Sequence, residues 1–180
     1  GALGLGAATV TGAVSLVGTT AATNLNINGA GVLTLGSSNR IGDSTAVVID
    51  GARLALGANN DMVGSLTVLN GGSLAGSGVL TAATYALQGG TIGASLASGA
   101  TLTLSGGTFD TATYANTISA FNLNLGALSG TGVLTASTYV LSGGVVAGAL
   151  GLGAATVNGA VSLVGTCLLY TSDAADDTPC

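Results

Sequence analysis

Few residues in this chain could catalyse a reaction, and nearly all of them are aspartates. The sequence contains no histidine and no glutamate, which excludes the usual catalytic triads and histidine-based metal sites. Asp43, Asp50, Asp61 and Asp110 remain in the main part of the chain. Two carboxylates about 5–9.5 Å apart can hydrolyse a glycosidic bond. Asp43 and Asp50 are the best pair, because they could flank one strand.

The same aspartates also have a structural explanation. Asp50-Gly51 and Asn60-Asp61 are dipeptides typical of turns. No G-x-S-x-G motif of the kind that carries a nucleophilic serine occurs together with a residue that could act as its base. The calcium-binding repeat G-G-x-G-x-D is also absent from the sequence. We therefore predict no catalytic, cofactor-binding or metal-binding residue, no cofactor and no enzyme activity in this segment.

Charge is sparse along the chain. The chain has two arginines, Arg40 and Arg53, and 7 acidic residues, so its net charge is −5. So few cations make nucleic acid an improbable partner. Disorder requires low hydrophobicity and high charge, whereas 48% of these residues are hydrophobic and 5% are charged. The apolar residues are mostly small, which favours a narrow interior over a globular core.

A long duplication organises the sequence. Residues 1–19 return as residues 148–166 with one change, Thr11 becoming Asn158, so the offset is 148 − 1 = 147. A shorter phrase, G-x-G-V-L-T, occurs at residues 29–34, 76–81 and 130–135. We therefore expect the 147-residue unit to consist of three related blocks, as in solenoids whose units bury their apolar faces on one another.

The local pattern predicts short strands. Aliphatic and polar residues alternate in stretches such as Asn24-Leu25-Asn26-Ile27-Asn28, and glycines punctuate the strands at corners. Such strands could form a sandwich or a membrane barrel, but near-identical segments stack best in register. We predict an all-β, right-handed parallel β-helix of roughly six to nine coils, each of about 18–24 residues. Val32, Val79 and Val133 are expected to face its interior. The charge-free span of residues 1–39 is too broken by Gly, Thr, Ser and Asn for a transmembrane helix.

Stacked coils explain the low charge. Equivalent residues in successive coils lie about 4.8 Å apart, where like charges repel by roughly 1 kcal/mol even in water. Uncharged Thr, Ser and Asn ladders avoid this repulsion and can form hydrogen bonds along the stack.

Residues 43–66 carry a family resemblance. They contain the runs D-S-T-A-V, G-A-x-L-x-L-G and N-x-x-x-x-G-S-L, and they resemble the autotransporter-associated β-strand repeat of bacterial passenger domains. The resemblance implies an exported stalk displayed on the bacterial cell surface, outside the outer membrane, with no membrane insertion of this segment. It also implies a translocator barrel, a signal peptide and contacts with host or neighbouring cells, all through regions outside this fragment.

Residues 167–180 differ from the rest. They hold both cysteines, the single proline and three of the seven acids, but no glycine. Residues 167–176 resemble one translated frame of a sequencing adapter, so we interpret residues 167–180 as a non-native tail, disordered or loosely packed. The first domain is then a solenoid fragment of residues 1–166, and its opening in mid-repeat indicates a missing N-terminus.

Two other functions remain open at this stage. An ice-binding solenoid would need one flat face of T-x-T triplets; Thr101-Leu102-Thr103 fits this pattern, but Asn24-Leu25-Asn26 does not. A polysaccharide-cleaving β-helix enzyme would need two of the aspartates to converge in a groove.

Overall fold

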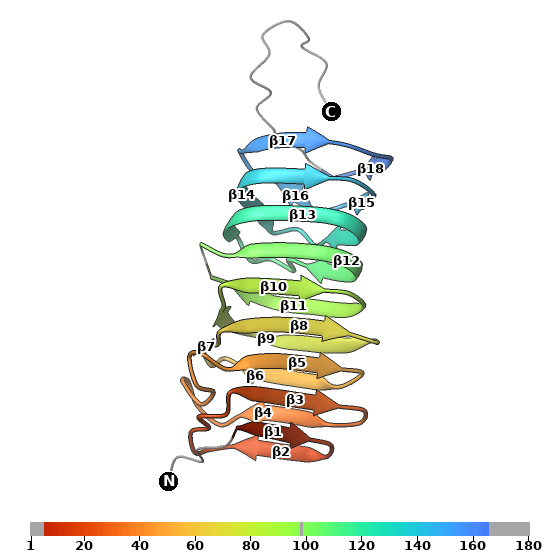
Figure 1. Cartoon of the computed structure of the whole chain (residues 1–180). Coiled ribbons are helices and arrows are strands. Elements are labelled where there is room, and N and C mark those ends of the chain that lie inside the picture. Colours follow the sequence, from red (N-terminus) through yellow and green to blue (C-terminus); the bar gives the residue numbers. More distant parts are fainter. Residues whose placement is uncertain (1–5, 98, 166–180) are drawn as a thin grey trace, which may run out of the picture.

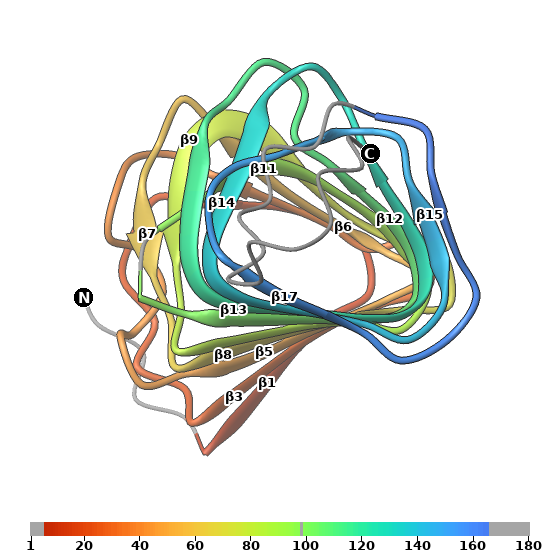
Figure 2. The same cartoon turned by 90° about the horizontal axis from the view of Figure 1, so that it is seen from above.

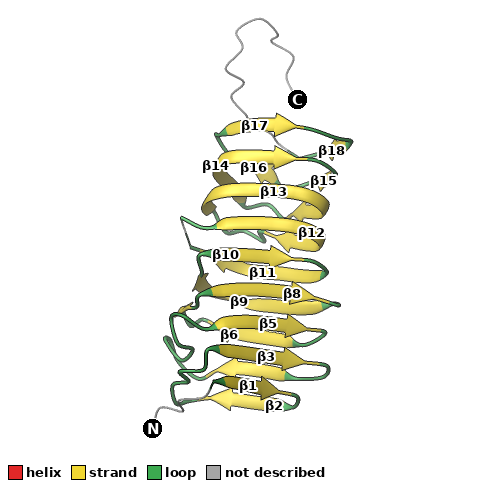
Figure 3. Cartoon of the chain, in the orientation of Figure 1, coloured by secondary structure: helices red, strands yellow, loops and turns green. Residues whose placement is uncertain are grey.

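The chain forms a right-handed parallel β-helix. The computed structural model describes residues 6–97 and 99–165, and within them it contains strands and loops but no helix (Figures 1 and 3). Within the described residues, the paired strands all run parallel to one another. Successive coils rise from the N-terminal to the C-terminal end around a three-sided interior, which is visible along the axis in Figure 2. The predicted fold class is therefore confirmed.

Strands on the first face form a continuous ladder of nine members. In order they are β1 (Ala7–Val10), β3 (Asn24–Asn28), β5 (Ala46–Asp50), β8 (Ser65–Leu69), β10 (Thr84–Leu87), the start of β12 (Thr101–Asp110), the middle of β13 (Asn116–Ser129), the end of β14 (Val133–Leu141) and β17 (Ala154–Val157).

The second face carries a matching ladder. Its members are β2 (Ala13–Leu16), β4 (Val32–Leu35), β6 (Arg53–Gly57), the start of β9 (Gly72–Thr81), the start of β11 (Gly90–Leu96), the ends of β12 and β13, β15 (Gly144–Val146) and β18 (Val161–Leu163).

The third face is the least regular. It holds β7 (Asp61–Met62), β16 (Ala149–Leu150) and the third-face portions of β9, β11, β13 and β14. A single bridge between Thr20 and Ile41 continues it to the lower coils. Several strands therefore bend around corners and contribute to more than one face.

The sequence duplication corresponds to a whole number of coils. Along the first face, Ala8 lies below Leu25, and the in-register chain of partners ends at Ala155, eight coils higher. The difference 155 − 8 is 147, the offset of the duplication. Single coils range from 16 residues (Tyr139 to Ala155) to 22 (Leu25 to Val47), so some are shorter than predicted.

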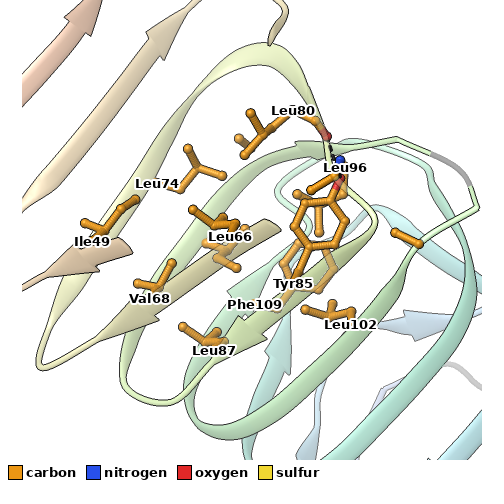
Figure 4. Close-up of a cluster of buried hydrophobic side chains, with 14 of the residues drawn as sticks. Ile49, Leu66, Val68, Leu74, Leu80, Tyr85, Leu87, Leu96, Leu102 and Phe109 are labelled. Atoms are coloured by element: carbon orange, nitrogen blue, oxygen red, sulfur yellow. Dashed lines mark hydrogen bonds between the residues drawn. The ribbon is translucent and has the colours of Figure 1, made fainter. Parts of the chain in front are cut away.

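Alternation places the large aliphatic and aromatic residues inside. One inward column of the first face is buried from coil to coil and consists of Leu25, Val47, Leu66, Tyr85, Leu102, Phe121 and Tyr139. Phe121 and Tyr139 meet edge to face, with ring centroids 6.4 Å apart. Figure 4 shows Tyr85 among the buried side chains of the middle coils, including Leu66, Leu102 and Phe109. Each buried large side chain contributes roughly 1.5–3 kcal/mol.

The orientation predicted for three valines is wrong. Val133 is 36% exposed, whereas its neighbour Leu134 is fully buried, and Val32 and Val79 likewise face outward beside buried leucines. In G-x-G-V-L-T the leucine, not the valine, is the inward residue. Side chains in a strand alternate between the inward and outward sides. A prediction that starts the alternation one residue too early or too late therefore reverses which side chains are buried. The parallel ladder itself does not depend on this phase.

The three G-x-G-V-L-T phrases are not structurally equivalent. Leu33 pairs with Leu54 on the second face, whereas Leu80 and Leu134 lie on the third face. The second and third phrases are three coils apart, and Tyr85 and Tyr139 are likewise three coils apart on the first face. The second and third phrases therefore occupy equivalent positions in the solenoid, but the first phrase does not. The distance in sequence between the first and second phrases is not a whole number of coils.

The interpretation of residues 167–180 as a non-native tail lies outside the described residues.

Candidate functional site

Asp43 and Asp61 are close enough to interact electrostatically, but the other aspartates lie on separate parts of the solenoid. Asp50 ends β5 on the first face and Asp110 ends β12 on the second, whereas Asp61 begins β7 on the third. Asp43 lies in the loop between β4 and β5. Asp43 and Asp50 do flank β5, but Ala46–Asp50 alone spans about 13 Å at the rise of a strand. That span exceeds the separation that a carboxylate pair needs.

Asp61 is buried and tied to the backbone. Its Oδ2 accepts a hydrogen bond from the backbone N–H of Arg40 at 2.8 Å and one from that of Ile41 at 3.2 Å. Its Oδ1 accepts a hydrogen bond from the N–H of Met62 at 2.9 Å. Desolvation by burial raises the pKa of Asp61, against the lowering effect of these hydrogen bonds, and the charge of Asp43 raises it further. Both oxygens are thus engaged in holding a loop.

Asp50 and Asp110 also have structural partners. Asn70 Nδ2 donates to Asp50 Oδ1 at 2.7 Å, and the N–H of Ala112 donates to Asp110 Oδ1 at 2.8 Å. Gly51, which follows Asp50, has a φ of 62°. The corner explanation therefore fits Asp50, while Asp61 differs from its predicted turn position, because it begins a short strand.

Two loops form a polar lobe on one edge of the lower coils. We define this lobe as residues 36–45 and 58–60, and Figure 1 shows these loops projecting beside β5 and β6. The N–H of Asn39 donates to the carbonyl of Asn60 at 3.0 Å, and the N–H of Asn60 donates to Ser38 Oγ at 3.0 Å. Within the lobe, Arg40 Nε donates to Ser37 Oγ at 2.6 Å. Only residues 43–45 and 58–60 of the lobe fall within the stretch that carries the family resemblance. Other polar groups of the lobe bond to the coils, as when Asn59 Nδ2 donates to the carbonyl of Leu35 at 2.9 Å and the N–H of Val79 donates to Asn60 Oδ1 at 2.8 Å.

The outward columns of the faces are almost free of charge. The central outward column of the first face runs through Thr9, Asn26, Val48, Thr67, Ala86, Thr103, Asn122, Val140 and Thr156. Asn122 Nδ2 donates to Thr103 Oγ at 3.4 Å, one coil below. The column contains the uncharged ladder residues that were predicted, although Thr alternates with Asn, Val and Ala instead of repeating.

Two tyrosines have a role that the sequence patterns did not suggest. Tyr85 Oη donates to the carbonyl of Leu80 at 2.7 Å and accepts from the N–H of Ala82 at 2.9 Å. Tyr139 repeats both bonds with Leu134 and Ala136. Figure 4 shows the Tyr85 hydroxyl reaching the backbone inside the corner. The recurring L-T-A-x-x-Y run is the signal that could have revealed this.

No group of three or more His, Cys, Asp or Glu that could hold a metal ion is found in residues 6–97 and 99–165. Within the same residues, no helix is long and apolar enough to cross a membrane.

Comparison with known proteins identifies no relative. No family model matches the chain, and neither the curated proteins nor the solved structures include a similar one. The fold and the contacts of the chain itself must therefore carry any functional assignment.

Proposed function

We propose that this segment is a structural stalk of an exported bacterial surface protein, an autotransporter or adhesin passenger. The observation that carries the proposal is the unbroken first-face ladder of nine strands over a buried core. A ladder of this kind resists bending and separation because every coil is bonded to its neighbours along the axis. At about 4.8 Å per coil, the eight coil steps separate the two ends by roughly 38 Å.

The chemistry of the surface supports the same proposal. Asp61, Asp50 and Asp110 are each bonded to groups of the protein itself, which leaves them poorly placed to act on a substrate. The resemblance of residues 43–66 to the autotransporter-associated β-strand repeat supplies the proposed location, outside the cell. Adhesion and translocation would be properties of other parts of the parent protein.

The alternatives receive less support. The first-face strands fan out around the axis from β1 to β17 (Figure 2), and their outward column is irregular, which does not favour the flat repeating surface that ice binding needs. The spread of the aspartates over three faces does not favour a polysaccharide-cleaving enzyme.

Surface labelling of cells that carry the parent gene tests the proposed location. An antibody raised against this chain should label intact cells, and external protease should remove the label. The parent reading frame should also encode a downstream translocator barrel. Labelling only after cell lysis would refute export, and release of sugar from polysaccharides by the purified chain would refute a purely structural role.

A further inference from the structure

Two Asn-Gly dipeptides lie at the corner between the first and second faces, in inner coils of the solenoid. Asn28-Gly29 leads from β3 toward β4, and Asn70-Gly71 connects β8 to β9. A third, Asn158-Gly159, lies in the last described coil, whereas these two have described coils above and below them. Asparagine before glycine is prone to deamidation, in which the glycine nitrogen attacks the asparagine side chain, because glycine has no Cβ to hinder the approach. The surroundings of the two inner dipeptides therefore decide which of them reacts.

The backbone of Asn28-Gly29 is held by the ladder. Asn28 is the last residue of β3 and pairs with Asp50. The N–H of Gly29 donates to the carbonyl of Asp50 at 2.9 Å, and the carbonyl of Asn28 accepts from the N–H of Gly31 at 3.0 Å. The attacking nitrogen is thus engaged in a hydrogen bond, and the corner must open before this nitrogen can react.

The backbone of Asn70-Gly71 is free by comparison. Both residues are exposed, and their φ values of 50° and 82° have the signs that a type I′ turn requires. Neither the carbonyl of Asn70 nor the N–H of Gly71 makes a hydrogen bond to any residue that the structure describes. A Cβ added to Gly71 would meet no atom within 4 Å, so the space around this peptide group is open to solvent.

The length of the corner between β8 and β9 explains this freedom. Leu69 and Ser73 pair with Asp50 and Arg53 of the coil below, so this corner spans 73 − 69 = 4 steps against 53 − 50 = 3. The register with the coil above gives the same excess, 72 − 68 = 4 against 90 − 87 = 3. With more residues than the corners below and above it, this corner leaves part of its backbone outside the ladder.

The side chain of Asn70 reaches the coil below. Asn70 Nδ2 donates to Asp50 Oδ1 at 2.7 Å. This hydrogen bond joins the coil of β8 to the coil of β5 at the corner where the backbone ladder is interrupted. It depends on the amide group that deamidation removes.

We propose that Asn70 is a site of spontaneous deamidation that loosens the solenoid with age. The Gly71 nitrogen loses its proton to water and forms a bond to Cγ of Asn70, the bond between Cγ and Nδ2 breaks, and ammonia leaves with a proton from solvent. Water then opens the succinimide ring. Breaking the new bond between the nitrogen and Cγ gives aspartate, and breaking the bond between the nitrogen and the backbone carbonyl carbon gives isoaspartate. In sum an amide and water give a carboxyl group and ammonia, so the reaction needs no oxidant.

Both products weaken the corner. Aspartate places a carboxylate where the amide donated to Asp50, so an attraction becomes a repulsion. Isoaspartate lengthens the main chain by a carbon atom in a corner that is already longer than its neighbours. Deamidation therefore loosens the contact between the coils of β5 and β8 while the ladders on the faces remain.

Peptide mapping of the aged chain tests the proposed site. The full chain is kept in mildly alkaline buffer, either folded or in urea, and is then digested with pepsin in acid and analysed by mass spectrometry. In the folded chain Asn70 should be converted roughly tenfold faster than Asn28, whose glycine nitrogen is protected by its hydrogen bond. In urea the two rates should become similar, because that hydrogen bond is absent. Equal rates in the folded chain, a difference that persists in urea, or an Asn70 that reacts only in urea would overturn the proposal.

Urea denaturation tests the consequence. The urea midpoint of the unchanged chain should fall with time, whereas that of Asn70→Gln, whose longer side chain disfavours the ring, should stay constant. Asn70→Asp, which is one of the two products, should lower the midpoint, and the loss should be smaller in an Asp50→Ala background. A midpoint that stays constant after Asn70 has been converted, or equal losses with and without Asp50, would overturn the loosening of the corner.

Discussion

At the scale of single residues, polar groups inside this solenoid hold its backbone in place. Tyr85 and Tyr139 hold corners of their coils through their hydroxyls, and Asp61 holds the polar lobe against β7. Sequence patterns located these residues but did not reveal their roles. The alternation rule says only whether a side chain points inward, and it gives no information on which backbone group lies opposite a hydroxyl or carboxylate.

Removal of the Tyr85 hydroxyl should destabilise the protein. Tyr85→Phe leaves the carbonyl of Leu80 and the N–H of Ala82 without this partner in a buried corner, at an expected cost of about 1–3 kcal/mol. Urea denaturation followed by circular dichroism measures the loss. Tyr114→Phe, at a half-buried tyrosine, is the control and should change the unfolding free energy by less than about 0.5 kcal/mol. Equal effects of the two variants would contradict the proposed role.

Asp61 should make the protein less stable as the pH rises. Burial raises its folded pKa above the ordinary value of 3.8, so the folded state binds the proton more tightly than the unfolded state does. The stability linked to this group is therefore fully present below the unfolded pKa and is lost as the pH rises through the folded pKa.

Urea midpoints measured from pH 3 to pH 7 check the sign of this effect. Asp61→Asn removes the titrating group, so the difference in stability between the original chain and the variant should shift against the original chain as the pH rises. A difference that stays constant with pH, or that shifts the other way, would contradict the raised pKa.

At the scale of elements, the corner between the first and second faces depends on a glycine column. Gly90, Gly107, Gly126 and Gly144 all have positive φ, and a Cβ added to any one of them would lie 2.6 Å or less from a backbone oxygen of the glycine below. The sequence predicted glycines at corners, and Gly90, Gly107 and Gly144 are predicted ones that have positive φ, whereas Gly126 was not singled out by the sequence pattern. Their stacking could not be predicted, because it depends on register between coils of unequal length.

Two glycines with similar φ separate backbone strain from crowding. Gly107 (φ 76°) would place a Cβ 2.5 Å from the carbonyl oxygen of Gly90, whereas Gly71 (φ 82°) has nothing within 4 Å of its added Cβ. Both alanine variants should lose roughly 1–2 kcal/mol to the left-handed backbone, and Gly107→Ala should lose about 1–3 kcal/mol more through overpacking. Chemical denaturation measures the unfolding free energy of both variants. Equal losses would contradict the predicted steric clash between the added Cβ of Gly107→Ala and the backbone of the coil below.

At the scale of the whole molecule, the coil is the unit that can be removed without loss of register. Deleting residues 66–84 joins Ser65 to Tyr85, and Ser65 and Thr84 occupy the same position in adjacent coils. The shortened chain should keep its far-UV circular dichroism per residue and be about 4.8 Å shorter by small-angle X-ray scattering. Deleting residues 66–74, about half a coil, moves every later strand to the wrong face and should abolish cooperative unfolding. Equal tolerance of both deletions would contradict a stacked core.

The fold could be predicted from the sequence more completely than the orientation of individual residues. Period-two alternation, glycine corners and the duplication were sufficient for a parallel β-helix and its approximate coil number, because these features report directly on strand pairing. The inward residue of G-x-G-V-L-T and the equivalence of its first occurrence could not be predicted. Loops such as the polar lobe make single coils longer than others. The number of coils between two phrases therefore cannot be calculated from a sequence spacing such as 76 − 29 = 47.

The agreement between the 147-residue offset and eight complete turns has a genetic consequence. Unequal recombination between the two near-identical stretches inserts or deletes a number of codons that always equals a whole number of turns. Descendant genes therefore encode solenoids of different lengths. The inward side chains remain in register where the two recombined segments join. Reach can then vary between lineages without any compensating substitution at the join.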